Sequence, residues 1–289
     1  MVRGQVRSRQ RRSVSIAFWI VSGGLLVVLA GIFGAPFVFK ALGLHQDFEG
    51  QRYVLPKGKA LIIATNHDRL GESGRETGVF LSELSAPYYE FLDGRMSVDV
   101  ASIEGGKIPI DPWSFKWFIR SDYDERYMSD PVLQSKVKNS LRIDELDFTQ
   151  YDVVFLAGGW GAAYDLGYSE ALGQKVSEAY AAGSVVGGVC HGLLGLLQAM
   201  DESGGPLVQG RQITAVTDKQ VAELGISITP QHPERELRAA GAIFESETAF
   251  RDMFANHVVV DGRIVSGQNQ NAGPEVANRM IEVAGGTRR

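Results

Sequence analysis

Cysteine is nearly absent from this sequence: Cys190 is the single thiol among 289 residues. One cysteine excludes an intrachain disulfide and a metal site built from several cysteines. No motif implies another metal site or an organic cofactor. A lone cysteine is more often a buried apolar residue than a nucleophile, so its surroundings must decide its role.

Basic residues are unevenly distributed along the sequence. The formal net charge is -5, although the first dozen residues contain no acid and several arginines, namely Arg3, Arg7, Arg9, Arg11 and Arg12. The rest of the chain is therefore more acidic than the total indicates. This balance argues against a nucleic-acid partner, because such binding needs a basic face.

Charged residues are absent from Val14 to Phe39. A helix over these roughly 26 residues exceeds the about 20 residues that cross a bilayer core. A cleaved signal peptide is the alternative, but its apolar region is shorter, at about 7–15 residues. We therefore predict a basic tail over 1–13 and an uncleaved membrane-spanning helix over 14–39.

The basic residues also predict an orientation. Arginines crowd the N-terminal side of the apolar segment, whereas only Lys40 and Arg52 follow it closely. The positive-inside rule places such a tail in the cytoplasm. The expected localisation is a single-pass membrane protein whose domain lies outside the cytoplasm.

After a linker over 40–58, residues 59–284 form one predicted domain without internal repeats. Its apolar runs suit buried parallel strands, at 60–64, 98–102, 153–157 and 185–189. Helical patterns lie between them, at 77–92, 169–182 and 193–200. This alternation predicts an α/β fold with a mostly parallel sheet covered on both faces.

Other segments modify this pattern. Pro87 is expected to kink the first helix or end it early. Residues 258–266 indicate a hairpin that turns at Asp261-Gly262, and 273–283 indicate a last helix. The polar insertion over 113–146 either shapes one wall of a site or forms a solvated excursion.

Small residues surround the cysteine. Residues 185–194 have the pattern of a strand, a sharp turn and a helix, with Gly188 and Gly192 on either side of Cys190. A nucleophile elbow needs small neighbours, because the nucleophile occupies a strained turn. The start of a helix also favours the thiolate over the thiol. This context indicates a reactive thiol.

A second glycine turn follows the preceding predicted strand, at Gly158-Gly159-Trp160-Gly161. In a parallel sheet this turn lies at the same edge as the cysteine. Backbone N–H groups of Gly159, Trp160 and Gly161, with that of Gly192 or its neighbour after the cysteine, could stabilise an oxyanion or bind substrate.

Several motifs together resemble the ThiJ/PfpI family of the class I glutamine amidotransferase-like superfamily. They are Thr77-Gly78, Ser82-Glu83, Pro87-Tyr88, 101–106, 109–112, 158–161, 190–192 and 258–267. The resemblance covers nearly all of residues 59–284. It implies a flavodoxin-like, doubly wound sheet and, in many members, a homodimer.

The resemblance also implies roles for three residues. Cys190 corresponds to the nucleophile, His191 to its partner and Glu83 to a carboxyl that points at the sulfur and moves protons. His191 either accepts the thiol proton or orients the substrate, because adjacent side chains diverge in direction. Without the resemblance, Glu83 would be an ordinary acid of a surface helix.

Two positions depart from the family pattern. Trp160 stands where the family usually has histidine, which removes a donor and makes the pocket more apolar. The heat-shock glyoxalases of the family have an acid in the segment that matches 214–225, where Val221 falls in this chain. Asp218 and Glu223 are close but offset, and Asp218 is the candidate for the third acid.

Two further polar pairs have simpler interpretations. His232-Pro233-Glu234 resembles the His-x-Glu pair of glutaminase domains. However, it follows Cys190 by only about 40 residues and has the composition of a helix start. His67 and Asp68 follow the first predicted strand, where they line the pocket or cap a loop.

Three functions are compatible with a reactive cysteine. The first is a glyoxalase-like enzyme in which Cys190 adds to a small reactive carbonyl or its adduct. The second is a cysteine amidase or peptidase. The third is a non-catalytic stress chaperone or redox sensor, because a thiolate is also oxidisable. A small molecule is the expected partner of the first two.

Overall fold

A computed structural model describes residue 31 and residues 34–288. The chain divides into two units, Met1–Leu42 and Gly43–Arg289. In the first unit, residues 34–42 are helical. The second unit contains the predicted domain and all the residues discussed below.

The predicted membrane localisation is contradicted by the part of the chain that the structure describes. Over residue 31 and residues 34–288, no helix has both the length and the apolar composition needed to cross a bilayer. The expected span of 14–39 lies largely outside the described residues, as does the tail over 1–13.

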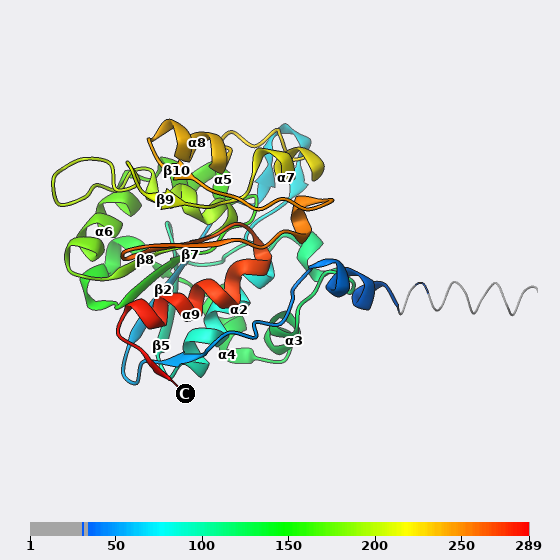
Figure 1. Cartoon of the computed structure of the whole chain (residues 1–289), viewed down its shortest axis with the longest axis horizontal. Coiled ribbons are helices and arrows are strands. Elements are labelled where there is room, and N and C mark those ends of the chain that lie inside the picture. The colour runs from blue at the N-terminus through cyan, green and yellow to red at the C-terminus, as the bar shows by residue number, and fades with distance from the viewer. Residues whose placement is uncertain (1–30, 32–33, 289) are drawn as a thin grey trace, which may run out of the picture. The chain divides into compact units, whose positions relative to one another are not determined.

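A seven-stranded sheet forms the centre of the second unit (Figure 1). Its order is β11 (Val258–Asp261), β12 (Ile264–Gly267), β8 (Val185–Val189), β7 (Val153–Leu156), β2 (Lys59–Ala64), β5 (Ser97–Ser102) and β6 (Leu141–Arg142). All neighbours are parallel except β11, which pairs with β12 as the predicted antiparallel hairpin. The expected mostly parallel α/β sheet is confirmed.

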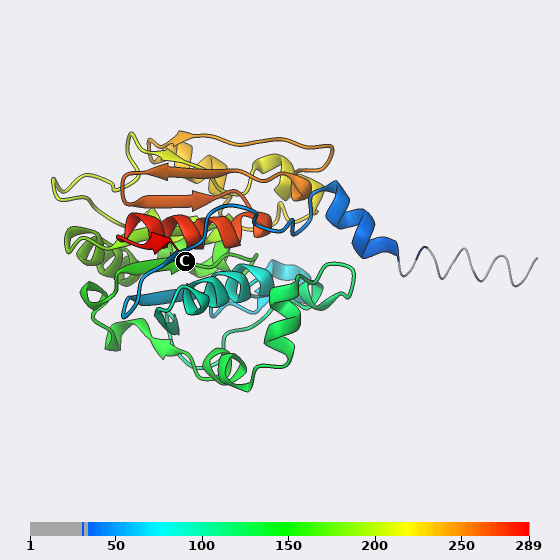
Figure 2. The ribbon, with the colours of Figure 1, turned by 60° about the horizontal axis from the view of Figure 1, so that its bottom comes forward.

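Both faces of the sheet are covered, as expected for parallel strands. Helices α2 (Leu81–Asp93) and α9 (Gly273–Val283) pack side by side on one face (Figures 1 and 2). Helices α5 (Ala162–Asp165) and α6 (Glu170–Ala181) pack with residues of the other face. Alternate residues of β2 belong to the two resulting cores, with Ile62 in one and Leu61 and Ile63 in the other.

Shorter elements complete the unit. They are α3 (Asp122–Met128), α4 (Pro131–Lys138), α7 (Asp218–Glu223) and α8 (Pro233–Ala239), with the strand pairs β1 (Tyr53–Val54) and β13 (Thr287–Arg288), β3 (Arg69–Leu70) and β4 (Arg75–Glu76), and β9 (Gln212–Ile213) and β10 (Ile243–Phe244). The insertion over 113–146 therefore contains two α-helices, α3 and α4, and the edge strand β6.

Helix α2 continues past Pro87 to Asp93, so of the two expected effects of the proline, a kink or an early end, the early end does not occur. The residues from Leu81 to Phe91 are all buried. Because helical stability in proteins comes mainly from such packing, the loss of one backbone hydrogen bond is tolerated.

The predicted linker is partly structural. Arg52 forms an ion pair with the carboxylate of Glu90, which is fully buried. The same carboxylate accepts hydrogen bonds from Tyr123 Oη and Asn278 Nδ2. The next residues of the chain, Tyr53–Val54, pair with the C-terminal strand β13. The folded unit thus starts before the predicted boundary at 59.

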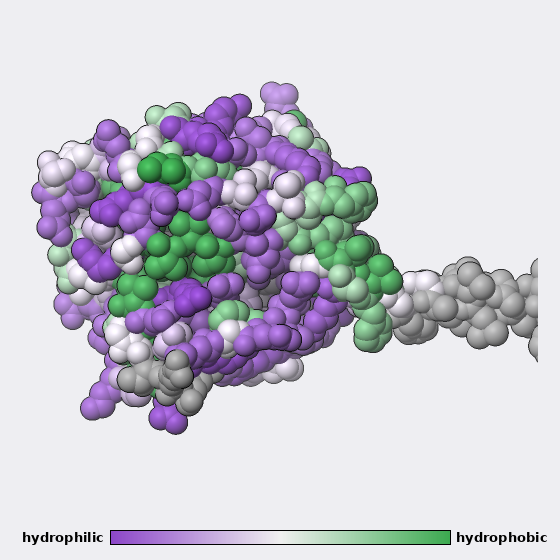
Figure 3. All heavy atoms as spheres, in the orientation of Figure 1, coloured by the Kyte–Doolittle hydropathy of each residue, from purple (hydrophilic) through white to green (hydrophobic). Residues whose placement is uncertain are grey.

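The face of the domain shown in Figure 3 is mostly hydrophilic with a few apolar patches. Exposed apolar side chains include Val260 on the edge strand β11 and Ile243 on β10. Scattered exposure of this kind is ordinary for globular proteins.

Gly188, in β8, tests the close packing of the central strands. Its φ is +156°, and a Cβ at this position would lie 2.0 Å from the carbonyl oxygen of Leu156 on β7. We expect Gly188→Ala to lower the free energy of unfolding by about 3 kcal/mol, because the two strands must separate. Urea denaturation would measure this change.

Gly205→Ala is the matched control. A Cβ there meets no atom closer than 3.6 Å, and the backbone needs no positive φ. Its effect should stay within about 0.5 kcal/mol. Equal stability of the two variants would contradict the packing argument.

Candidate active site

Cys190 occupies a strained turn at the end of β8. Its φ is +57°, a value that costs about 1–2 kcal/mol for a residue with a Cβ. The chain then enters a short 3-10 helix over Cys190–Leu196. This is the predicted strand, turn and helix, although the helix is 3-10 rather than α.

The glycine after the nucleophile serves packing. A Cβ on Gly192 would lie 2.2 Å from the carbonyl oxygen of Leu156, so only glycine lets the helix approach β7. Gly192 is buried and does not line the cavity beside Cys190. Its expected role at the substrate therefore has no support in this position.

Glu83, in the first turn of α2, lies against the thiol. Its side chain is buried and interacts with that of Cys190. The position of Gly158 explains how the two groups come so close. A Cβ there would lie 2.4 Å from Glu83 Oε2 and 2.9 Å from Cys190 Cβ. The structure thus brings together the expected nucleophile and carboxyl.

Burial raises the pKa of Glu83 to about 8. Interactions with the Cys190 thiol and with the backbone N–H groups of Gly159 and Gly158 act in the opposite direction but are weaker. The carboxyl is therefore protonated at neutral pH, and it can give up or take a proton near that pH.

Burial also raises the pKa of the Cys190 thiol, and the negative charge of an ionised Glu83 raises it further. The backbone N–H groups of His191 and Gly159 lower it, in the direction expected for a helix start. Desolvation outweighs them because the cysteine is only 5% exposed. Glu83 and the thiol therefore affect each other's ionisation.

His191 is fully buried, with Nδ1 3.4 Å from Cys190 Sγ. Burial lowers the pKa of His191 to about 3, so its imidazole is neutral near pH 7. Within the described part of the chain, its Nε2 atom has no hydrogen-bond partner. No acid completes a triad with this histidine there.

The candidate third acid, Asp218, lies elsewhere. Its carboxylate is 3.5 Å from Nδ1 of His232 and about half exposed. Val221, which takes the family position of the acid, is fully buried. Glu223 accepts a hydrogen bond from the backbone N–H of Asp252. The structure therefore pairs Asp218 with His232 rather than with His191.

The two polar pairs agree with their simpler interpretations. His232 is the residue before α8, and Glu234 accepts hydrogen bonds from the backbone N–H of Asp218 and from Arg238. This is the predicted helix start. His67 stacks on Tyr164 with ring centroids 4.1 Å apart, and its Nε2 contacts the carbonyl oxygen of Arg69. It belongs to a loop and does not line the cavity.

The residues of the second glycine turn differ in their relation to the cavity. Gly159 has a φ of +97° and lines the cavity, and its N–H lowers the pKa of the Cys190 thiol. It is thus a donor at the nucleophile. Gly161 donates its N–H to the carbonyl oxygen of Gly78, so it is committed to holding the loop. Trp160 lines the cavity with its side chain.

A cavity of about 390 Å³ opens beside Cys190. Its apolar walls are formed by Phe80, Trp113, Ile119, Trp160, Val216 and Leu224. Trp113 and Ile119 come from the polar insertion, so this segment forms part of the cavity wall. Its volume lies within the ~300–1,000 Å³ typical of small-molecule sites.

Other lining residues were missed by the sequence analysis. They come from segments that are far apart in the sequence, and three of them are polar or charged: Leu44, Arg75, Gln220, Met253 and Gln270. No motif marks them, because only the folded chain brings these loops together. Leu44 even precedes the predicted domain.

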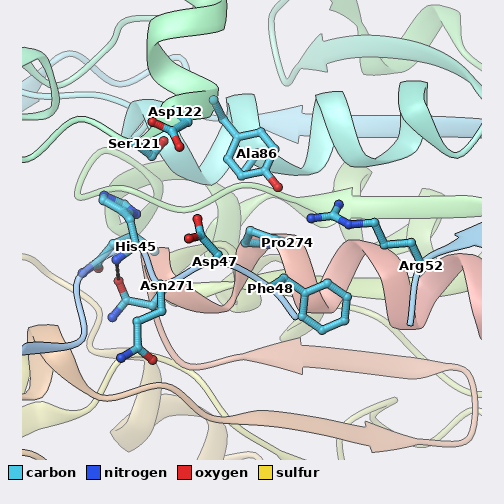
Figure 4. Close-up of a pocket in the computed structure, with 12 residues that line it drawn as sticks. His45, Asp47, Phe48, Arg52, Ala86, Ser121, Asp122, Asn271 and Pro274 are labelled. Atoms are coloured by element: carbon cyan, nitrogen blue, oxygen red, sulfur yellow. Dashed lines mark hydrogen bonds between the residues drawn. The ribbon is translucent and has the colours of Figure 1, made fainter. Parts of the chain in front are cut away.

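Figure 4 shows a second, smaller cavity of about 60 Å³. It is lined by residues before β1, including His45 and Asp47, and His45 donates its backbone N–H to Asn271 Oδ1 at 2.9 Å. It shares Gln270 with the larger cavity but contains no thiol. The nucleophile therefore identifies the larger cavity as the candidate active site.

Fold and site together define an α/β protein with a cysteine at a nucleophile elbow and a protonated carboxyl beside it. The sequence profile of the DJ-1/PfpI family matches residues 76–283. The chain belongs to this family, which confirms the resemblance to ThiJ/PfpI proteins.

Similar proteins include enzymes by name. The chain is 28% identical over 242 residues to "Glutathione-independent glyoxalase hsp3101" of Schizosaccharomyces pombe, covering 79% of this chain and 96% of the relative. The crystal structure of glyoxalase III from Candida albicans is 26% identical, with a TM-score of 0.71, covering 78% of this chain and 97% of that one. The expectation of an enzyme agrees with these names.

Another solved structure has a similar fold. The 24 kDa Rapid Encystment Protein of Francisella tularensis is 29% identical, with a TM-score of 0.73. The match covers 78% of this chain and 99% of that one. These likenesses support the flavodoxin-like sheet expected from the sequence.

Replacement of Glu83 tests its raised pKa through stability. The unfolded carboxyl ionises above pH 4.5, whereas the folded one keeps its proton until about pH 8. Stability from this group is therefore lost as pH rises between these values, by up to ~1.4 kcal/mol per unit. Glu83→Gln should become progressively more stable than the wild type from pH 5 to 8, as measured by urea denaturation.

Glu76→Gln removes one exposed carboxyl and is the control for a change in net charge. It should not reproduce this growing difference. A constant stability difference between Glu83→Gln and the wild type from pH 5 to 8 would mean that Glu83 is ionised in the folded protein.

Proposed function

We propose that this protein is a glyoxalase-type enzyme that works without glutathione and uses Cys190 as its nucleophile. The observation that carries the proposal is the protonated Glu83 carboxyl held against a buried cysteine at a strained turn. The names of the similar proteins support the same reaction class. The substrate would be a 2-oxoaldehyde and the product a 2-hydroxycarboxylic acid.

In the first step, Sγ of Cys190 bonds to the aldehyde carbon while the carbonyl oxygen gains the proton, which gives a hemithioacetal. The N–H of Gly159, which lines the cavity and interacts with the thiol, would stabilise the developing negative charge on this oxygen. The thiol of the protein thereby replaces the thiol of glutathione.

In the following steps, the hydrogen of the former aldehyde carbon leaves as a proton, and a proton is added to the neighbouring carbon. The first carbon is oxidised to a thioester and the second is reduced to an alcohol, so no external oxidant is needed. Water then cleaves the thioester, which releases the hydroxy acid and restores the thiol.

The pKa values assign the proton transfers. Glu83, with a pKa of about 8, can donate and accept protons at neutral pH, whereas His191, with a pKa of about 3, is a weak base. We therefore assign the transfers to Glu83. His191, with its Nδ1 at 3.4 Å from Sγ, fixes the position of the thiol.

The alternatives have less support. Amide hydrolysis needs a histidine that protonates a leaving amine, and no acid orients His191 among the described residues. A redox sensor needs an accessible thiolate, whereas this thiol is buried and its pKa is raised.

Replacement of the nucleophile tests the proposal. Cys190→Ala should reduce the conversion of methylglyoxal to lactate by at least ~1,000-fold in the absence of glutathione, because the covalent step is lost. Lactate formation and the consumption of methylglyoxal would be measured together.

Unfolding should not confuse this result, because Cys190→Ala removes only the sulfur atom, adds no volume and leaves the backbone strain at this position unchanged. Circular dichroism would confirm the fold. Turnover that is unchanged in Cys190→Ala, or absent from the wild type with every 2-oxoaldehyde, would contradict the proposal.

A further inference from the structure

The cavity beside Cys190 is much larger than the smallest 2-oxoaldehydes require. Its volume is about 390 Å³, whereas one water occupies ~30 Å³ in the liquid. A three-carbon substrate at the sulfur would leave most of this space filled with water. Such water is poorly held where the walls are apolar, so a substrate that displaces it binds more tightly.

The walls near the thiol are aromatic and aliphatic. Trp160, which is 9% exposed, and Trp113, which is 47% exposed, line the cavity together with Phe80. Trp160 stands where the resemblance predicts histidine, so a polar donor is replaced by a flat apolar surface. These rings offer a face on which a planar substituent can stack.

The polar groups of the cavity are largely engaged in the fold. Oε1 of Gln220 accepts a hydrogen bond from Asn269, and Nε2 of Gln270 donates to the carbonyl oxygen of Met253. Glu223 accepts from the backbone N–H of Asp252. The guanidinium of Arg75 lies over the Trp160 ring, with Cζ 5.8 Å from its centroid. Glu83 and His191 are the polar groups at the thiol itself, and the walls farther from it are mainly apolar.

We infer that the preferred substrates are 2-oxoaldehydes with an aromatic or bulky apolar substituent. The aldehyde carbon would lie at Cys190 Sγ, and the substituent would pack between Trp113 and Trp160. This inference rests on the proposed function and adds the substrate class. The larger substituent supplies binding at a distance from the reacting carbon, which accelerates the reaction when it helps to position that carbon.

Phenylglyoxal and methylglyoxal are the two probes, because they share the reacting group and differ only in the substituent. The wild type should use phenylglyoxal with a kcat/KM at least ~10-fold higher, since even one methylene in an apolar pocket changes this ratio ~10-fold or more. Initial rates of mandelate and lactate formation would be compared. Short reaction times are needed, because both aldehydes also modify arginine side chains of the enzyme.

Two tryptophans of one segment provide matched variants. Trp113 lines the cavity, whereas Trp117 does not, and both are about half exposed, at 47% and 43%. Trp113→Ala should lower the preference for phenylglyoxal by ~5-fold or more, mainly through KM. Trp117→Ala should leave the preference unchanged.

The outcomes separate this inference from the proposed function. A wild type that uses methylglyoxal as well as or better than phenylglyoxal, with both activities lost in Cys190→Ala, would overturn the inference and leave the glyoxalase proposal intact. An equal loss of preference in Trp113→Ala and Trp117→Ala would also overturn it. Turnover of neither aldehyde would overturn both.

Discussion

The contact between the Glu83 carboxyl and the Cys190 thiol is the constraint on which the site depends. It requires a missing side chain at Gly158, a nucleophile with positive φ and a strand end buried on both sides. Each of these conditions costs stability, because a strained residue and a desolvated acid are both unfavourable. The sheet and the two helices beside it, α2 and α9, must supply that stability.

The same contact defines how protons are held. Because both acids are buried, they keep their protons at pH 7, whereas an exposed glutamate would lose its proton. A neutral histidine alongside cannot compensate, because its own charged form is excluded by burial. The pair therefore holds a transferable proton beside the thiol, which suits the two opposite proton transfers of the proposed reaction.

The sequence predicted best those features that depend on a short local pattern of residues. The buried strands, the elbow at Cys190 and the glycine turn at Gly159 follow from local patterns of apolar and small residues. Membrane localisation was predicted from composition over residues 14–39 and is not supported by the described part of the chain. Pro87 was misleading because tertiary packing, which a local pattern does not contain, outweighs its helix-breaking effect.

The walls of the cavity could not be predicted, because they come from loops with no common motif. Arg75, Leu224 and Gln270 meet only in the folded chain. The third acid illustrates the opposite limit. Asp218 is three residues before Val221, which takes the family position of the acid, and its carboxylate contacts His232 rather than His191. A shift of a few residues along a helix changes which side chain a group can reach.

The pairing of β1 with β13 has a consequence for how the domain assembles. Tyr53 faces Arg288, so this small ladder joins residues from the two ends of the folded unit. Because these residues are far apart in the sequence, their pairing closes a very long loop. The loss of chain entropy on closing this loop is small only after the intervening chain has become compact. The ladder is therefore expected among the last parts to form during folding. Because it lies beside α9 rather than at the cysteine, its local opening would leave the contact between Glu83 and Cys190 in place.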